Sequence, residues 1–413
     1  MQLLQPLFGM FVFIGIAWLL SEKRSAIRPK TVAAGLLAQF LFGLLLLKTP
    51  GIQEAFLSLN ALVNAISQAT EAGTAFVFGF LGGAQTPYDT THPTNSFILA
   101  FRALPLVLVI SAISSLLYYW RILPLVINAF SWILQKSLGI SGALGLGAAA
   151  NVFVGMIEVP LMIRPYLREL SRSELFALMS TGMATIAGTV MVLYASIVGS
   201  VIEGAMGHIF AASLLSVPAV LMLAHIMIPE EEQLQSQTQF KLPATASSSM
   251  DAITKGTVDG IQLLINIIAM LIVFVALVHL ANQMLALISG DEVLTLQKIL
   301  GWMMAPLVWL TGIPWSEAPQ AGALMGIKTI LNELLAYLQL ANTDSSVLSQ
   351  HSKTIMLYSL CGFANLGSLG ITIGGLGAMA PERKGEIIEL GFKSIIAGTL
   401  ATLMTGALAG MLL

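Results

Sequence analysis

The sequence has little charge and almost no cysteine. Charged residues make up 10% of its 413 positions and hydrophobic residues 56%, whereas soluble domains carry about 25% charged residues. The single cysteine, Cys361, excludes a disulfide within the chain. The five histidines lack metal-ligand spacing, and the chain has neither a phosphate-binding loop before a helix nor a nucleophile elbow. These absences argue against a soluble protein and against an enzyme, and they leave an integral membrane protein.

Long apolar runs predict an all-α polytopic membrane protein, because each run is close to the ~20 residues that a bilayer requires. Gly51–Thr70 has one apolar face but is too polar to span, which predicts an interfacial helix. Gln85–Asn95 is a polar loop, and Pro229–Ser249 predicts a mobile connection. We expect about eight transmembrane helices: Leu3–Leu20, Val32–Leu47, Phe97–Tyr119, Leu175–Ile202, Ala205–Ile228, Ile261–Leu287, Thr354–Met379 and Ile387–Leu413.

Basic residues orient the chain. The first apolar run has no basic residue before it and several after it, so it is typical of a retained first span rather than a secretory signal. The positive-inside rule then places the following loop in the cytoplasm and both termini outside. The basic residues that agree with this topology are Lys23, Arg24, Arg28, Lys30, Arg121, Lys136, Arg164, Arg168, Arg172, Arg383 and Lys384.

Two apolar segments are interrupted by glycine and proline, namely Leu138–Leu167 and Ile299–Leu340. We expect each to form a re-entrant hairpin, because non-helical backbone at membrane depth is tolerated only where protein or a cavity covers it. Leu138–Ile228 and Ile299–Leu413 share the order broken hairpin, broken span, span. This order favours an inverted repeat, which is typical of transporters, over ordinary glycine-rich helix packing.

Two acidic residues, Glu158 and Glu333, lie in apolar surroundings. A carboxylate near the bilayer centre costs at least ~2.5–3.5 kcal/mol, so it persists only where it faces a bundle interior or an aqueous cavity. This favours a transport site over a structural partner for a buried arginine or backbone amide. Glu333 could accept two hydroxyl hydrogen bonds from a ribose diol.

Small and polar residues interrupt the seventh span at Phe363–Gly370. Asn365 and Ser368 are three residues apart and share a helical face if the helix persists, so they could bind a polyol. Phe363 could pack against a flat ring, or simply against neighbouring helices.

A second interruption, Ala184–Gly188, lies in the fourth span. A loosened helix there would free the Thr185 and Ile186 carbonyls. With the Asn151 side chain, the Val154 carbonyl and the Thr185 hydroxyl, these oxygens would suit a hard cation such as Na⁺. The alternative is that asparagine and threonine only form hydrogen bonds between helices.

Five motifs occur in order: Gly73–Gly79, Ala150–Pro160, Pro314–Ala318, Asn332-Glu333 and Gly362–Ser368. Together they resemble the concentrative nucleoside transporter family in its bacterial form, over nearly the whole chain. The resemblance implies a homotrimer in the bacterial inner membrane that moves nucleosides inward by an elevator-like displacement. It implies Na⁺ as the coupling ion, with H⁺ in some members. A non-concentrating pore on the same scaffold is a rival hypothesis.

The resemblance also implies roles for individual residues. Glu158 would bind the base, with Val190 and Phe363 beside it, and Glu333, Asn365 and Ser368 would hold the ribose. The Na⁺ site would consist of Asn151, Val154, Thr185 and Ile186.

One departure concerns the base. Met156 and Ile157 stand where the family usually has Gln and then Thr or Ser, so an amide contact to the base is lost. A missing hydrogen bond to a buried polar atom costs ~1–3 kcal/mol. We therefore expect a base preference different from that of Gln-containing members, and modified nucleosides are possible substrates.

The expected regions follow the same plan. A scaffold region with spans 1–3 and the interfacial helix covers 1–120, and the first transport half with hairpin 1 and spans 4–5 covers 121–228. A mobile loop and scaffold span 6 occupy 229–290. The second transport half, with hairpin 2 and spans 7–8, covers 291–413.

Overall fold

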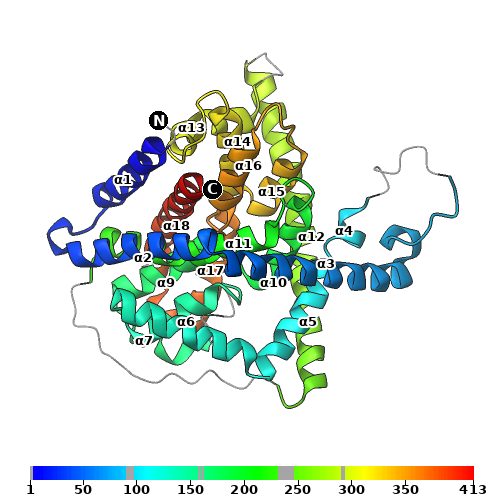
Figure 1. The fold of residues 1–413 in the computed structure, drawn as a ribbon, viewed down its shortest axis with the longest axis horizontal. Coiled ribbons are helices and arrows are strands. Elements are labelled where there is room, and N and C mark those ends of the chain that lie inside the picture. Colours follow the sequence, from blue (N-terminus) through cyan, green and yellow to red (C-terminus); the bar gives the residue numbers. More distant parts are fainter. Residues whose placement is uncertain (1–2, 90–96, 157–158, 160–161, 231–245, 290–293) are drawn as a thin grey trace.

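The computed structural model describes residues 3–89, 97–156, 159, 162–230, 246–289 and 294–413, and over these ranges every regular element is a helix. In the first half the elements are α1 (Leu4–Leu19), η1 (Arg24–Ala26), α2 (Pro29–Lys48), α3 (Pro50–Phe78), η2 (Gly79–Gly82), α4 (Leu99–Arg102), α5 (Leu106–Tyr119), α6 (Ile122–Leu138), α7 (Gly142–Asn151), η4 (Arg164–Tyr166), α9 (Arg172–Ala184), α10 (Gly188–Val198) and α11 (Ala205–Met227). The second half contains α12 (Ser249–Ser289), α13 (Leu296–Trp309), α14 (Ala318–Ile330), α15 (Glu333–Asn342), α16 (Gln350–Leu360), α17 (Leu366–Met379), η5 (Pro381–Arg383) and α18 (Lys384–Leu412). Helices of the two halves pack against one another, as α11 does against α18 (Figure 1).

Each of the eight predicted spans corresponds to a helix or to a pair of short helices. In the described part of the chain, six stretches are long and apolar enough to cross a membrane. The first predicted span is α1, of 16 residues, and the seventh is the pair α16 and α17. The six stretches are Pro29–Lys48, Leu99–Tyr119, Arg172–Val198, Ala205–Met227, Ser249–Ile288 and Pro381–Leu412.

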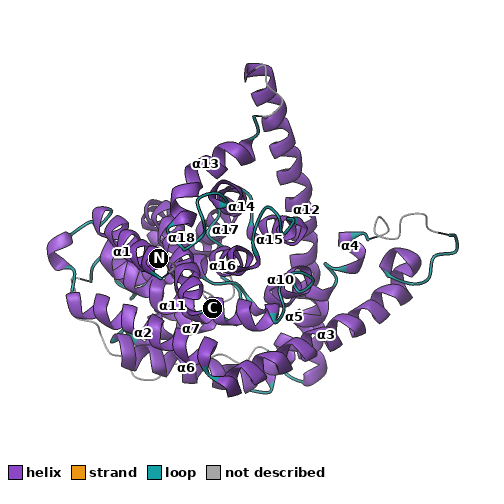
Figure 2. Cartoon of the chain, turned by 45° about the horizontal axis from the view of Figure 1, so that its top comes forward, coloured by secondary structure: helices purple, strands orange, loops and turns teal. Residues whose placement is uncertain are grey.

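Some boundaries differ from those expected. Helix α3, which we predicted as an interfacial helix, runs eight residues further, to Phe78 rather than Thr70. The third span is divided at Pro105 into α4 and α5, because proline disfavours helical geometry in the residue before it. Helix α12 starts 12 residues earlier than expected, at Ser249, and is 41 residues long. Figure 2 shows that it projects beyond the other helices. Most of the predicted mobile connection, 231–245, lies outside the described residues.

The hairpins are built from helices too short to span a membrane. Helix α7 has 10 residues and α15 has 10, which gives each about 15 Å of length against a hydrocarbon core of about 30 Å. The first hairpin begins at Ser141, whose side chain caps α7. Four residues of its predicted second arm, at 157–158 and 160–161, lie outside the described residues.

The second hairpin is narrower than the predicted Ile299–Leu340. Its arms are α14 and α15, joined at Leu331 and Asn332, whereas α13 is a separate helix packed along α14. A Cβ on Gly322 would lie 2.5 Å from the carbonyl oxygen of Gly301. Gly322 and Gly326, which we interpreted as hairpin interruptions, therefore serve close packing of α13 on α14.

The broken spans are confirmed. Helix α9 ends at Ala184 and α10 begins at Gly188, and likewise α16 ends at Leu360 and α17 begins at Leu366. A long helix follows each pair, α11 in the first half and α18 in the second. Helix α18 packs against both α9 and α16, so it lies beside both interruptions.

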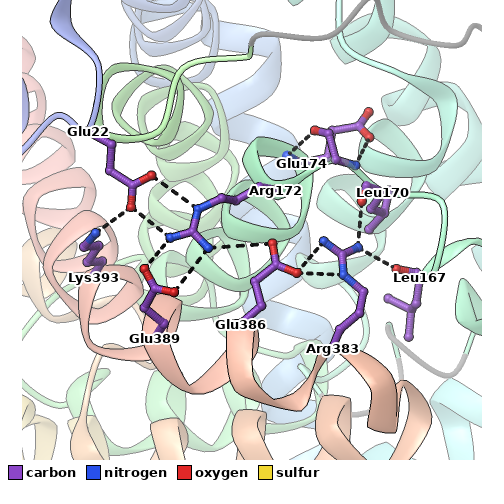
Figure 3. Close-up of polar contacts among 10 residues, drawn as sticks. Glu22, Leu167, Leu170, Arg172, Glu174, Arg383, Glu386, Glu389 and Lys393 are labelled. Atoms are coloured by element: carbon purple, nitrogen blue, oxygen red, sulfur yellow. Dashed lines mark hydrogen bonds and ion pairs between the residues drawn. The ribbon is translucent and has the colours of Figure 1, made fainter.

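A cluster of charged side chains joins the loop after α1 to the starts of α9 and α18 (Figure 3). Arg172 forms ion pairs with Glu22 at 3.0 Å and Glu389 at 2.6 Å, and Lys393 also pairs with Glu22 at 2.6 Å. Arg383 pairs with Glu386 and donates to two backbone carbonyls before α9. The N-terminal helices are thus tied to the broken helices through one loop.

Candidate functional site

A cavity of about 200 Å³ lies where the second hairpin, both broken spans and α12 meet. Polar residues of the hairpin and α17 and mostly apolar residues of α12 line this space. Its lining includes Met156, Val190, Tyr194, Leu263, Asn266, Ile267, Met270, Phe274, Asn332, Glu333, Phe363, Asn365 and Ser368.

Glu333 is an acidic residue that lines this cavity. Asn332 caps α15 by accepting a hydrogen bond from the Leu335 backbone at 2.9 Å, which places Glu333 in the first turn, where the helix dipole favours a negative charge. The hydroxyl of Tyr194 donates to Glu333 Oε1 at 2.6 Å, and the Asn365 amide donates to Oε2 at 2.9 Å. Each carboxylate oxygen keeps a further lone pair. Glu333 can therefore accept two more hydroxyl groups from a ligand.

Asn365 and Ser368 form the start of α17. The predicted interruption lies just before them, because Asn365 is the N-cap and accepts a hydrogen bond from the Ser368 backbone at 2.7 Å. The cap orients the Asn365 amide toward Glu333. The N-termini of α15 and α17 therefore both lie at the cavity, and they present partial positive charge to it.

Helix α12 contributes a largely apolar wall. Leu263, Ile267, Met270 and Phe274 contribute to it, and a Cβ at Gly367 would lie 3.5 Å from both Met270 Cε and Phe274 Cζ. Sequence reasoning missed this wall. Asn266, a polar residue within an apolar span, was the available signal.

Six of the seven predicted substrate residues line this one cavity: Met156, Val190, Glu333, Phe363, Asn365 and Ser368. The seventh, Glu158, lies outside the described residues, as does Ile157. Met156 is anchored from the side, since the hydroxyl of Thr372 donates to its sulfur at 3.5 Å. Its thioether supplies apolar surface to the cavity and no amide.

The predicted cation ligands gather at the first interruption. Thr185 is buried, and its hydroxyl lies 3.3 Å from the carbonyl oxygen of Asn151 and 2.9 Å from that of Thr181. The Gly188 amide donates to the Phe153 carbonyl at 3.3 Å instead of continuing the helix. Asn151 and Ile186 are buried and Val154 is half-buried. Neutral oxygens around unwound backbone are a donor set that fits a hard monovalent cation.

The Thr185 carbonyl, which we expected to be free, has a hydrogen-bond donor. The oxygen of Thr185 accepts a hydrogen bond from the backbone of Phe363 at 3.3 Å. The two interruptions are therefore joined to each other directly. The Ile186 carbonyl and the Thr185 hydroxyl remain as the candidate ligands from this segment.

Two buried residues of this region were not predicted. Tyr194 is a polar group within an apolar span, which was a usable signal. Lys328 on α14 is fully buried, and its Nζ donates to the Ser359 carbonyl at 2.8 Å and to the Thr402 hydroxyl at 2.9 Å. A lysine inside an apolar hairpin was an equally visible signal.

Comparisons with known proteins agree with this arrangement. A family model described as Na⁺ dependent nucleoside transporter C-terminus matches residues 208–410, its N-terminal counterpart matches 8–81, and a Gate model described as nucleoside recognition matches 100–201. The nucleoside permease NupC of Helicobacter pylori is 36% identical, over 98% of this chain and 96% of the permease. Sodium/nucleoside cotransporter 2 of Rattus norvegicus is 34% identical over 98% of this chain and 62% of its own length.

Solved structures are also similar. CNTnw in an inward-facing substrate-bound state has a TM-score of 0.91 at 37% identity, covering 100% of this chain and 98% of that one. The fold, the cavity around Glu333 and these similarities define a multi-pass membrane transporter for nucleosides. The chain belongs to the concentrative, Na⁺-dependent nucleoside transporter family.

Proposed function

We propose that this protein is a Na⁺-coupled symporter that imports nucleosides across a bacterial inner membrane. The observation that carries this proposal is the position of Glu333. It is held by Tyr194 and Asn365 at a cavity lined by both polar and apolar side chains. A nucleoside likewise has two parts, because its ribose is a polyol and its base is a flat ring.

The ribose would bind the polar residues. Glu333 would accept hydrogen bonds from the two ribose hydroxyls, and Asn365 and Ser368 would supply amide and hydroxyl groups from the start of α17. The base would lie between Phe363, Val190 and Met156. Glu158 would bind the base from the first hairpin, and Met156 and Ile157 would set a preference different from that of Gln-containing transporters.

Na⁺ would bind at the first interruption, with ligands from Asn151, Val154, Thr185 and Ile186. The ion would act only as a charge held by neutral oxygens. This charge would stabilise the unwound backbone between α9 and α10. The hydrogen bond between Thr185 and Phe363 supports coupling, because any shift of one interruption displaces the other. Ion and nucleoside would then raise each other's affinity by the same factor.

The motion would be elevator-like. The scaffold region would be 1–120 with α12 of 229–290, and the transport region would be 121–228 with 291–413. Support comes from the apolar α12 wall, along which the polar site could slide without breaking hydrogen bonds to it. We also propose a homotrimer with both chain termini outside the cell.

The decisive experiment is uptake of radiolabelled uridine into proteoliposomes, with Na⁺, K⁺ and pH gradients varied separately. We expect saturable accumulation that an inward Na⁺ gradient drives and a K⁺ gradient does not. Accumulation driven by a pH gradient alone would indicate H⁺ coupling. Uptake that never exceeds the external concentration would indicate a pore, because a pore cannot concentrate solute.

A further inference from the structure

Lys328 is a buried lysine whose two hydrogen-bond partners are both neutral. It belongs to α14, the first arm of the second hairpin, and is 0% exposed. The two partners are the Ser359 carbonyl and the Thr402 hydroxyl. Among the described residues no carboxylate forms an ion pair with it. Burial of an ammonium is costly unless polar groups compensate it, so the position of these oxygens requires an explanation.

The explanation lies in the interruption of the seventh span. In a continuous helix the Ser359 carbonyl would accept from the backbone of Phe363, four residues on. Helix α16 ends at Leu360, and the Phe363 amide donates to Thr185 instead. The break thus leaves the Ser359 carbonyl at a helix C-terminus, where unpaired carbonyls carry partial negative charge. Lys328 supplies the positive charge for this end.

The first half has the same arrangement without a lysine. There α7, the first arm of the first hairpin, ends at Asn151, whose carbonyl meets Thr185 at the C-terminal end of α9. The groups that meet here, the Asn151 carbonyl and the Thr185 hydroxyl, are neutral. Among the described residues the only buried lysines are Lys328 and Lys353, both in the second half, and no arginine is buried. In each half, a helix C-terminus presents oxygens that a cation would stabilise. Only in the second half does the chain itself provide a positively charged side chain there.

We propose that Lys328 is a tethered counterpart of the transported ion, which fills the cation position of the second half. One free cation then moves per nucleoside, at the first interruption only. Lys328 is a positioning residue: its charge holds the end of α16 so that Phe363 and Asn365 face the cavity. This inference rests on the proposed Na⁺-coupled transport.

The number of transported ions tests it in the unmodified protein. In proteoliposomes with the membrane potential held at zero, the opposing nucleoside gradient that stops net flux is measured for a fixed Na⁺ gradient. With one ion per nucleoside, a roughly tenfold Na⁺ gradient is balanced by a roughly tenfold nucleoside gradient, whereas two ions would require roughly a hundredfold. A ratio of two overturns the role of Lys328. Absence of any Na⁺-driven flux instead overturns the proposed function.

Variants test the charge itself. Lys328→Ala should lower nucleoside affinity at least tenfold, and added ethylammonium should restore much of it by replacing the missing ammonium. Lys353→Met is the matched control. Lys353 is also buried, but it lies near the start of α16, away from the interruption, and donates to the Thr343 carbonyl. This substitution should lower thermal stability and leave nucleoside affinity unchanged. A folded Lys328→Ala protein with unaltered affinity, or with a loss that ethylammonium does not reverse, contradicts the proposal. If the variant does not fold, the ion ratio of the unmodified protein decides.

Discussion

The backbone amide of Phe363 donates to the carbonyl oxygen of Thr185 at 3.3 Å, although the two residues belong to different halves of the chain. Both lie where a helix is interrupted, and each interruption provides the partner that the other one lacks. The link connects the proposed Na⁺ ligands to the proposed base contact. A single hydrogen bond would therefore transmit the proposed coupling between ion and substrate.

Removal of the Thr185 hydroxyl tests this route. Thr185→Val keeps the shape of the side chain and removes one oxygen from the proposed Na⁺ site. We expect the Na⁺ concentration needed for half-maximal nucleoside binding to rise about tenfold, which corresponds to ~1.4 kcal/mol. Because coupling is reciprocal, nucleoside affinity at fixed low Na⁺ should fall as well. The measurement is calorimetric binding at a series of Na⁺ concentrations.

Thr181→Val is the control for this substitution. Thr181 is also buried, but its hydroxyl donates to the Ala177 carbonyl within α9 and lies before the interruption. Its loss should leave the Na⁺ dependence unchanged. Equal effects of the two substitutions would mean that packing of α9, rather than ion binding, is being measured.

The pair Tyr194 and Tyr337 separates ligand positioning from stability. The rings are 5.1 Å apart and both residues are buried, but only the Tyr194 hydroxyl donates to Glu333, while that of Tyr337 donates to the Leu357 carbonyl. Tyr194→Phe should weaken nucleoside binding about tenfold, because one fixed donor to the carboxylate is lost at ~1–3 kcal/mol. Tyr337→Phe should lower the melting temperature and leave affinity intact.

Glu333→Gln should abolish uptake in a folded protein, and measurable uptake would contradict the ribose assignment.

Much of this site could be predicted from the sequence because its signals are local. An acidic residue in an apolar run and a glycine-rich break in a span are visible within about ten residues, and Glu333, Asn365 and Thr185 were found in this way. The partners of Glu333 were not found, since Tyr194 is 139 positions away. Only packing of the hairpin against α10 brings them together.

The extent of the second hairpin was wrong for a related reason. Helices α13 and α14 are both apolar and contain glycine and proline, so their sequence pattern does not distinguish a hairpin arm from a helix packed beside it. The α12 wall was missed because an apolar side chain that faces a cavity has the same pattern as one that faces lipid. Contacts of this kind depend on tertiary structure alone.

Base selectivity should depend on Met156. Its thioether adds apolar surface to the cavity and offers the base no amide. We expect the ranking of nucleosides in competition uptake to differ from a uridine-first order, and Met156→Gln to move it toward that order. Val190→Ala, which only enlarges the cavity, is the control and should weaken all nucleosides alike. A uridine-first ranking in the unmodified protein would refute the assignment.

Acid should weaken the charged cluster around Arg172. The hydrogen bond from the Arg172 guanidinium holds the pKa of the Glu22 carboxyl below its ordinary value of 4.5, against the opposing effect of burial. A lowered carboxyl pKa means that the folded state gains stability above the ordinary value and loses that gain as the pH falls through the lowered one. Glu22→Gln should therefore lower the melting temperature at neutral pH, and the difference from the unmodified protein should begin to shrink near pH 4.5 and close below the lowered pKa. Glu203→Gln, at an exposed turn, should have no effect at either pH.

The same cluster can report the elevator motion. Glu22 belongs to the proposed scaffold region and Arg172 to the proposed transport region, and their side chains meet at 3.0 Å. In a Cys361→Ala background, a short thiol cross-linker between Glu22→Cys and Arg172→Cys should hold the two regions in one arrangement and stop uptake until it is cleaved. The control pair, Arg168→Cys with Glu382→Cys, replaces an ion pair of 2.7 Å whose partners both belong to the transport region. That cross-link should leave uptake unchanged, because its ends would travel together. If the first cross-link forms and uptake continues, the two regions do not move against each other at this point, and transport must proceed by local gating around the cavity.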